Sequence, residues 1–203
     1  IRVWGIDAAN PSRVHFTDIL DPEVWSVLNF MDFNPEDGDR VTAMTRAGQD
    51  LLITKQWSMA LLTGTTTTNY SIVWLDTEQG ATGKRAIYNT NKYMAYVAQD
   101  GIRFTDFNTS IVATERLTPD WNRINKRRLN QAAMIYWRNT LLVALPANNS
   151  LYNNTVWVYD FLRNAWSINT GWNVSAWCIF NQYGEDVLLA CDSMTGQVYE
   201  AMK

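Results

Sequence analysis

Short apolar runs separated by turn residues repeat along the whole chain. Many runs alternate apolar and polar positions, which is the period of a strand with one buried face, and helical periodicity is almost absent. Between the runs lie residues that tolerate positive φ or preset a bend. These turn signals are Asn10-Pro11, Asp37-Gly38, Ala47-Gly48, Gln79-Gly80, Asp100-Gly101, Ala147-Asn148-Asn149-Ser150, Tyr183-Gly184 and Thr195-Gly196. The pattern predicts many short antiparallel strands.

The most apolar of these strands recur at a nearly fixed distance. They begin at Val3, Leu51, Met94, Leu141 and Val187, so successive starts are 48, 43, 47 and 46 residues apart. A period in the forties is typical of propeller blades, because each twisted sheet of about four strands must stack on its neighbours to bury both faces. We therefore predict an all-β chain, a β-propeller of about five four-stranded blades whose first and last are incomplete.

The blades are predicted near residues 1–30, 41–76, 85–115, 130–169 and 174–202, within one propeller or propeller fragment that spans residues 1–203. Four complete blades and part of another do not close a ring by themselves. We therefore expect either that the chain is part of a larger ring or that its two ends pair.

One segment falls outside this repeat. Residues 117–129 lack a strand pattern and are predicted to form a long connection, or a short helix capped by Thr118 with Pro119 in its first turn. The sequence starts at Ile1 inside a strand-like run, so we expect it to begin within a larger protein. No signal peptide can be read from it.

Composition supports a folded, β-rich chain, and the net charge does not indicate any class of binding partner. Of the 203 residues, 47% are apolar, enough for a substantial core, and the 10 Trp, 9 Tyr and 7 Phe favour pleated surfaces. The formal net charge is only -3, unlike that of strongly basic nucleic-acid or membrane-surface binders. No apolar run approaches the roughly 20 residues of a membrane helix, so we expect no membrane partner.

Cys178 and Cys191 are the only cysteines. A disulfide framework in a secreted domain normally needs more than two. A single bridge stays open as an alternative, but two buried free thiols are favoured.

A series of weak motifs in a consistent order resembles the β-propeller proteins of tailed-bacteriophage virions, found at the head-to-tail connection and in tail nozzles. The motifs are residues 10–18 with Asp21-Pro22-Glu23-Val24-Trp25, residues 38–43 with 51–55 and 61–64, residues 96–102, residues 154–160 with 164–167, and residues 192–200. In the second of these, a lysine, Lys55, ends the inner strand. Each motif alone is poorly specific, and the resemblance lies in their order over most of the chain.

The resemblance implies an architectural role in the virion. It implies a rigid disc, assembled as a homo-oligomeric ring with other virion proteins around a channel for DNA, and made in the cytoplasm of a host bacterium. No catalytic residue and no cofactor is carried over, so we expect a protein that is not an enzyme. Two alternatives stay open: a propeller that binds a host surface or glycan and, less favoured, a glycosidase-type propeller.

One acidic loop is open to two interpretations. Oxygen ligands at alternate positions can bind Ca²⁺, and the weak candidates are Asp32, Asn34, Glu36, Asp37 and Asp39. However, Gly38 falls one place late for a twelve-residue calcium loop and no helix flanks it. Because Asp and Asn are ordinary turn formers, a solvated turn is favoured and no metal is predicted.

The only basic cluster lies in the predicted connection. It comprises Arg123, Lys126, Arg127 and Arg128. Such residues can neutralise phosphates, but no aromatic residues interleave with them to stack on bases. We expect at most sequence-independent contact with DNA, and weigh it against contact with a protein partner and against a solvated loop.

The remaining chemistry-bearing residues give little support to catalysis. His15 is the sole histidine, which excludes His-rich metal sites and favours a cross-strand surface position. Paired carboxylates could serve a glycosidase, but Asp76, Asp106 and Asp160 sit at strand ends where turn geometry explains them. The tryptophans could include a sugar-stacking platform, although most are expected to fill the space between blades.

Overall fold

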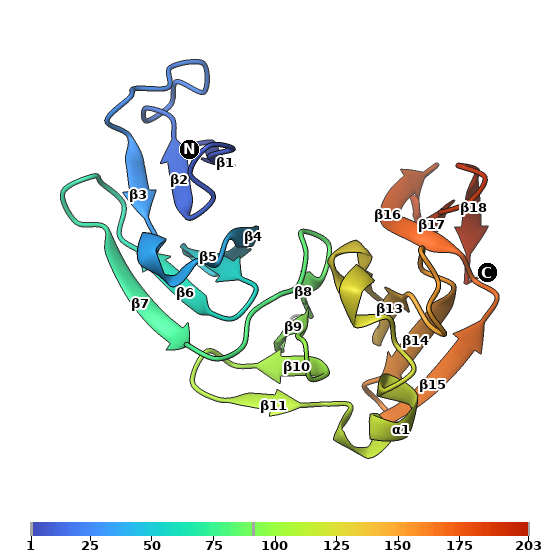
Figure 1. Cartoon of the computed structure of the whole chain (residues 1–203). Coiled ribbons are helices and arrows are strands. Elements are labelled where there is room, and N and C mark those ends of the chain that lie inside the picture. Colours follow the sequence, from blue (N-terminus) through green and yellow to red (C-terminus); the bar gives the residue numbers. More distant parts are fainter. Residues whose placement is uncertain (1, 91, 203) are drawn as a thin grey trace. The chain divides into compact units, whose positions relative to one another are not determined.

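Strands make up nearly all of the regular structure in a computed structural model of the chain (Figure 1). The structure describes residues 2–90 and 92–202. Ile1, Asn91 and Lys203, which the predicted blade and domain boundaries include, lie outside the described residues. Five antiparallel sheets of three or four strands form within the described residues, which confirms the prediction of an all-β chain.

Contacts group the strands into two compact units, and the first ends at Gly80. It holds a three-stranded and a four-stranded sheet, in which each strand pairs with the next along the chain. The strands are β1 (Trp4–Ile6), β2 (Arg13–Phe16), β3 (Phe30–Asp32), β4 (Val41–Ala47), β5 (Asp50–Lys55), β6 (Met59–Thr63) and β7 (Ser71–Asp76). The short 3-10 helix η1 (Pro35–Asp37) links the two sheets. Val14, Phe33, Ile53 and Leu62 are among the residues of their shared core.

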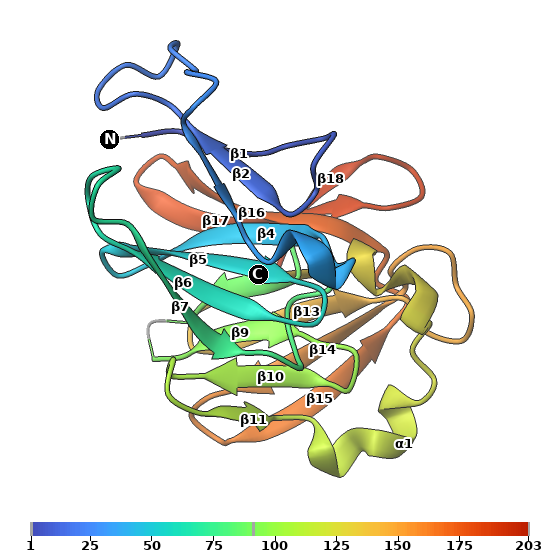
Figure 2. The same ribbon diagram turned by 60° about the vertical axis from the view of Figure 1, so that its left-hand side comes forward.

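The second unit starts at Ala81 and holds three further sheets with the same sequential order (Figure 2). Its strands are β8 (Ile87–Asn89), β9 (Met94–Val97), β10 (Ile102–Thr105), β11 (Ser110–Val112), β12 (Ala133–Trp137), β13 (Thr140–Leu145), β14 (Thr155–Asp160), β15 (Ala165–Thr170), β16 (Val174–Gln182), β17 (Glu185–Asp192) and β18 (Val198–Ala201). The last sheet, β16 to β18, has three strands and the other two have four.

The continuous apolar run of β13 reflects burial on both faces of its sheet. Leu141 and Val143 belong to the core shared with the β8–β11 sheet, whereas Leu142 and Ala144 belong to the core shared with β16–β18. A strand buried on both faces reads as an apolar run instead of an alternation, since side chains point to opposite faces in turn. Truncating Leu141 or Leu142 to Ala would therefore cost roughly 2–5 kcal/mol of stability.

The first strands of the sheets in the second unit contact one another in order. β8 contacts β12, and β12 contacts β16. Together with the sequential order of strands within each sheet, this arrangement is consistent with blades that meet along their first strands.

The connection between β11 and β12 is helical in part. It contains η2 (Glu115–Leu117), α1 (Thr118–Trp121) and η3 (Lys126–Gln131). A short helix forms as expected, but the predicted cap is wrong, because Thr118 is the first helical residue and its hydroxyl donates to the carbonyl of Glu115. No helix in the described part of the chain has the length and apolar character to cross a membrane.

Candidate functional site

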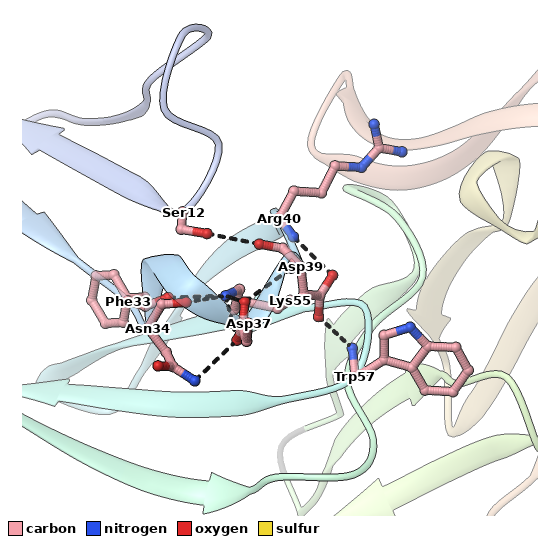
Figure 3. Close-up of polar contacts among 8 residues, drawn as sticks. All are labelled: Ser12, Phe33, Asn34, Asp37, Asp39, Arg40, Lys55 and Trp57. Atoms are coloured by element: carbon pink, nitrogen blue, oxygen red, sulfur yellow. Dashed lines mark hydrogen bonds and ion pairs between the residues drawn. The ribbon is translucent and has the colours of Figure 1, made fainter.

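A cluster of polar groups in the first unit surrounds the ammonium group of Lys55 (Figure 3). Lys55 ends β5, and its side chain is only 1% exposed. Its Nζ donates to the carbonyls of Phe33 and Asn34, at 2.9 and 3.1 Å, and to both carboxylate oxygens of Asp37, at 2.5 and 2.7 Å. The lysine thereby ties the end of β5 to the loop that follows β3.

The loop conformation presents these oxygens to Lys55. Asn34 and Gly38 flank η1 with left-handed backbones, φ 46° and 71°, so the chain reverses on both sides of one short turn. Asp39 extends the cluster, because its two carboxylate oxygens accept from the backbone N–H groups of Arg40 and Trp57 at 2.8 Å each. Its own N–H donates to Asp37.

Ion pairing sets the charge state of two of the three carboxylates here. Burial alone would raise the pKa of Asp37, but hydrogen bonds from Lys55, the Asp39 N–H and Asn34 outweigh it and hold the pKa below its ordinary value. The pKa of Asp32 is lowered chiefly by Arg13, whose guanidinium contacts the carboxylate at 2.7 and 2.8 Å. Asp39 has no cationic partner within ion-pair distance in the described residues.

A cavity of about 520 Å³ adjoins this cluster. Asp32, Asp37 and Asp39 contribute to one part of its wall, and Trp57 and Trp74 to another. Trp57 lies in the turn between β5 and β6, Trp74 lies on β7, and the two residues are 47% and 40% exposed. Acidic oxygens and accessible indole rings therefore line the same cavity.

The five calcium candidates lie together, but most of their oxygens already have protein partners. Asp32 pairs with Arg13, Asp37 with Lys55, and Asp39 with two backbone N–H groups. Asn34 offers its carbonyl to Lys55 and its amide to Asp37, while Glu36 is exposed. No group of three or more His, Cys, Asp or Glu side chains suited to a metal occurs in the described residues. The ammonium group of Lys55 lies among these weak calcium candidates and binds the oxygens of Asn34 and Asp37.

The basic cluster divides into one engaged and three more exposed side chains. Lys126 lies 3.7 Å from the centre of the Trp121 ring and donates to the Trp121 carbonyl at 3.0 Å. Burial lowers its pKa to about 8. Arg123, Arg127 and Arg128 are exposed, and the guanidinium of Arg123 lies 3.7 Å from the carboxylate of Asp120. The exposed arginines are the part of this cluster that a partner can reach.

His15 is engaged with an acidic neighbour. It lies on β2, with Nε2 2.9 Å from the carboxylate of Asp7. That contact, followed by backbone N–H groups of Asn10 and Ala9, lowers the pKa of Asp7 far below its ordinary value. The pair joins the loop after β1 to β2.

The three acidic residues considered for glycosidase chemistry each close a turn. Asp76 accepts from the N–H groups two and three positions ahead, at 2.9 Å each. Asp106 and Asp160 repeat the same pattern. Each carboxylate thus stabilises its own turn, as the sequence pattern indicated.

The cysteines are free, but they are not buried as expected. Cys178 is exposed and Cys191 is partly buried, and they face different partners in the β16–β17 ladder, Leu189 and Ala176. β16 and β17 are nine and eight residues long and are joined by Tyr183 and Gly184, both at positive φ. The end of this long hairpin is exposed, which explains why Cys178 is accessible.

Sequence reasoning overlooked an exposed apolar loop between β2 and β3. Its large apolar side chains are 44% to 83% exposed, and they are Ile19, Leu20, Val24, Trp25, Val27 and Leu28. The sequence does contain a sign of this loop. Adjacent apolar residues lie on either side of Asp21-Pro22, whereas a half-buried strand would alternate apolar and polar residues. A cluster of this kind is typical of a protein interaction surface.

Comparisons with known proteins bear on the fold alone. No family model matches the sequence, and no curated protein does. A chain in the crystal structure of the mitotic checkpoint complex is similar over 95% of this chain and 60% of that one, with TM-score 0.55 and 10% identity. Two other solved structures have lower TM-scores. The computationally designed Ika4 protein has a TM-score of 0.48 and 12% identity, and the match covers 80% of this chain and 91% of that one. The AfRom2 CNH domain has a TM-score of 0.39 and 8% identity, and the match covers 98% of this chain and 78% of that one. The chain spans less than two thirds of the checkpoint-complex chain.

Proposed function

We propose that the chain is a non-catalytic, propeller-type component of a tailed-bacteriophage virion, located at the head-to-tail connection or in the tail. It assembles with copies of itself and with other virion proteins into a ring around the DNA channel. The ordered series of motifs from residue 10 to residue 200 supports the phage context. The protein is then made in the bacterial cytoplasm and resides in the virion.

The repeated sheets support the propeller part of the proposal. Each is a meander of consecutive strands, and the second strands of the last four sheets, β5, β9, β13 and β17, carry the apolar residues that recur along the sequence. In the second unit the first strands contact in order, as they do where blades meet near an axis.

The observation that carries the assembly role is the exposed apolar loop of residues 19–28. Leu20, Val27 and Leu28 are 77%, 83% and 80% exposed. Scattered apolar residues are normal on a surface, but several large ones in one short loop mark an interaction site. Burial of apolar area is the main favourable term in protein association.

The turn roles of the strand-end carboxylates favour an architectural over a hydrolytic role. Asp76, Asp106 and Asp160 bind the N–H groups of their own turns. A general acid or base would instead need to face a bound substrate. Exposed Arg127 and Arg128 suit weak, sequence-independent contact with phosphates, which is all that a DNA conduit requires.

The test is assembly of a loop variant. We expect the wild-type chain to form a discrete oligomer as concentration rises, seen by mass photometry and as rings by electron microscopy. The triple substitution Leu20→Ser, Val27→Ser and Leu28→Ser should abolish the oligomer and leave the β-rich circular dichroism unchanged. Leu162→Ser, which alters an exposed leucine of the second unit, is the matched control and should assemble normally.

Three results would count against the proposal. Equal assembly of the triple variant and the wild type would show that the loop is not the interface. Turnover of a polysaccharide, lost on replacing one acidic residue, would replace the architectural role with a glycosidase role. Binding on a glycan array would favour the alternative of a host-surface or glycan-binding module.

A further inference from the structure

We infer that the cavity of the first unit, between the η1 loop and β7, binds the guanidinium group of an arginine side chain. This inference concerns one site and does not depend on the proposed virion role.

The charge on the cavity wall favours a cation. Three carboxylates line it, but among the described residues only Asp32 and Asp37 have ion-pair partners, Arg13 and Lys55. The Asp39 oxygens each accept one backbone N–H, and a carboxylate has about four lone-pair sites, so each oxygen can accept another donor. A ligand with a positive charge and N–H donors would pair with the Asp39 carboxylate and fill its remaining lone-pair sites. The negative charge of the cavity wall would repel an anion.

The indole rings favour a flat cation. Trp57 and Trp74 line the same cavity and are both accessible. A cation over an indole face is attracted by the ring quadrupole, and the planar guanidinium also stacks on aromatic rings. An arginine can thus place its flat face on a ring and its N–H edge on a carboxylate.

A buried hydroxyl without a partner supplies a second observation. Ser58 lines the cavity and is 8% exposed, and its Oγ has no hydrogen-bond partner in the part of the chain that the structure describes. An unsatisfied buried polar group is unfavourable, so a ligand that pairs with it gains affinity. A guanidinium carries five N–H donors and no acceptor, which suits a wall of carboxylate and hydroxyl oxygens.

Two sources can present this group. One is a second copy of the chain, whose Arg127 and Arg128 are exposed on η3. The other is a different protein with an exposed arginine loop. The ligand chemistry is the same in both.

The test uses a small probe and its neutral isostere. N-acetyl-arginine amide is titrated into the ¹⁵N-labelled chain, and the indole N–H resonances are followed, with Trp57 and Trp74 assigned by Trp→Phe substitution. We expect saturable shifts of these two resonances, with a dissociation constant on the order of 1 mM. N-acetyl-citrulline amide, which has the same shape without the charge, should shift neither, and about 1 M salt should weaken binding.

Matched variants distinguish binding in this cavity from attraction of the probe to the negative surface in general. Asp39→Asn should weaken arginine binding about tenfold, since a hydrogen bond to a charged group is lost. Glu36→Gln removes a neighbouring exposed charge outside the cavity wall and should leave binding unchanged. Because Asp39 also holds two backbone N–H groups, Trp74→Leu is a second test, and Trp25→Leu, another exposed indole outside this cavity, is its control.

Three outcomes would overturn the inference: no saturable shift with the arginine probe, an equal shift with the citrulline probe, or a shift with neutral oligosaccharides alone, which would make the cavity a sugar site. Self-association of the variants then shows whether a second copy of the chain or another protein supplies the arginine. If Arg127→Ser with Arg128→Ser and Asp39→Asn each weaken it, a second copy supplies the arginine. If both associate normally while the probe still binds, another protein supplies it.

Discussion

Replacing Lys55 with Met tests how far one buried ammonium group holds the first unit together. Met fills much of the space of the lysine stem but carries no donor. The substitution leaves the Asp37 carboxylate and the carbonyls of Phe33 and Asn34 without the donor they share. The first unit should therefore unfold at a lower urea concentration than in the wild type.

The magnitude follows from the burial of the two partners. Removing one member of a buried ion pair costs about 3–5 kcal/mol, and a hydrogen bond to a charged group is worth about 1.5–3 kcal/mol. The Lys55 side chain is 1% exposed but that of Asp37 is 25% exposed, so water can solvate the carboxylate that is left. We therefore expect a loss of about 2–3 kcal/mol in the free energy of unfolding.

The assay is urea unfolding followed by the indole resonances of Trp4 and Trp57, which report the first unit alone. A double-mutant cycle with Asp37→Asn should give a coupling energy of at least about 1 kcal/mol. Lys84→Met, at an exposed lysine of the second unit, should change stability by less than about 0.5 kcal/mol.

The effect should also depend on pH. Because the pKa of Asp37 is lowered in the folded chain, its ionised form stabilises the fold above the unfolded pKa of about 3.9. That contribution is lost as pH falls through the lower folded pKa, so wild type and variant should converge in acid. A loss below about 1 kcal/mol at neutral pH, or additive single substitutions, would refute the reasoning.

Three further predictions concern other parts of the chain. Gly80→Ala should cost about 1–3 kcal/mol in urea unfolding, because the new Cβ would collide with the backbone oxygen of Lys55; an unchanged midpoint would contradict this. Burial lowers the pKa of Lys126 to about 8, whereas the unfolded value is about 10.5. The free energy of unfolding of the wild type should therefore rise by about 1 kcal/mol between about pH 8 and 10.5, a figure reduced for the partial exposure of the side chain. Lys126→Met should remove this rise. Iodoacetamide should alkylate exposed Cys178 before partly buried Cys191, as read by peptide mass spectrometry; the reverse order would show that the hairpin end is covered.

Features fixed within a few residues could be predicted from the sequence. The Asp residues that end strands accept from N–H groups two and three positions ahead, so Asp76 and Asp160 form their turns through local geometry alone. Strand β13 (Thr140–Leu145) is likewise predicted, from the apolar run that begins at Leu141.

Contacts between distant residues could not be predicted in this way. The sequence showed a lysine after an apolar strand and acidic residues in an earlier loop, but the cavity needs Asp39, Trp57 and Trp74 to meet from three segments. The pattern of apolar pairs around Asp21-Pro22 does not reveal whether those side chains pack inward or face solvent. Only the packing of the neighbouring sheet decides that.

The sequence by itself determined that the chain is all-β, because side-chain alternation and turn chemistry act over two to five residues. The tertiary structure decided that Lys55 points inward to an acidic loop 18 residues earlier, at Asp37, and that Cys178 faces outward. The physical reason is that burial depends on which sheet covers a given face. That covering is a property of the whole packed unit and not of any short segment.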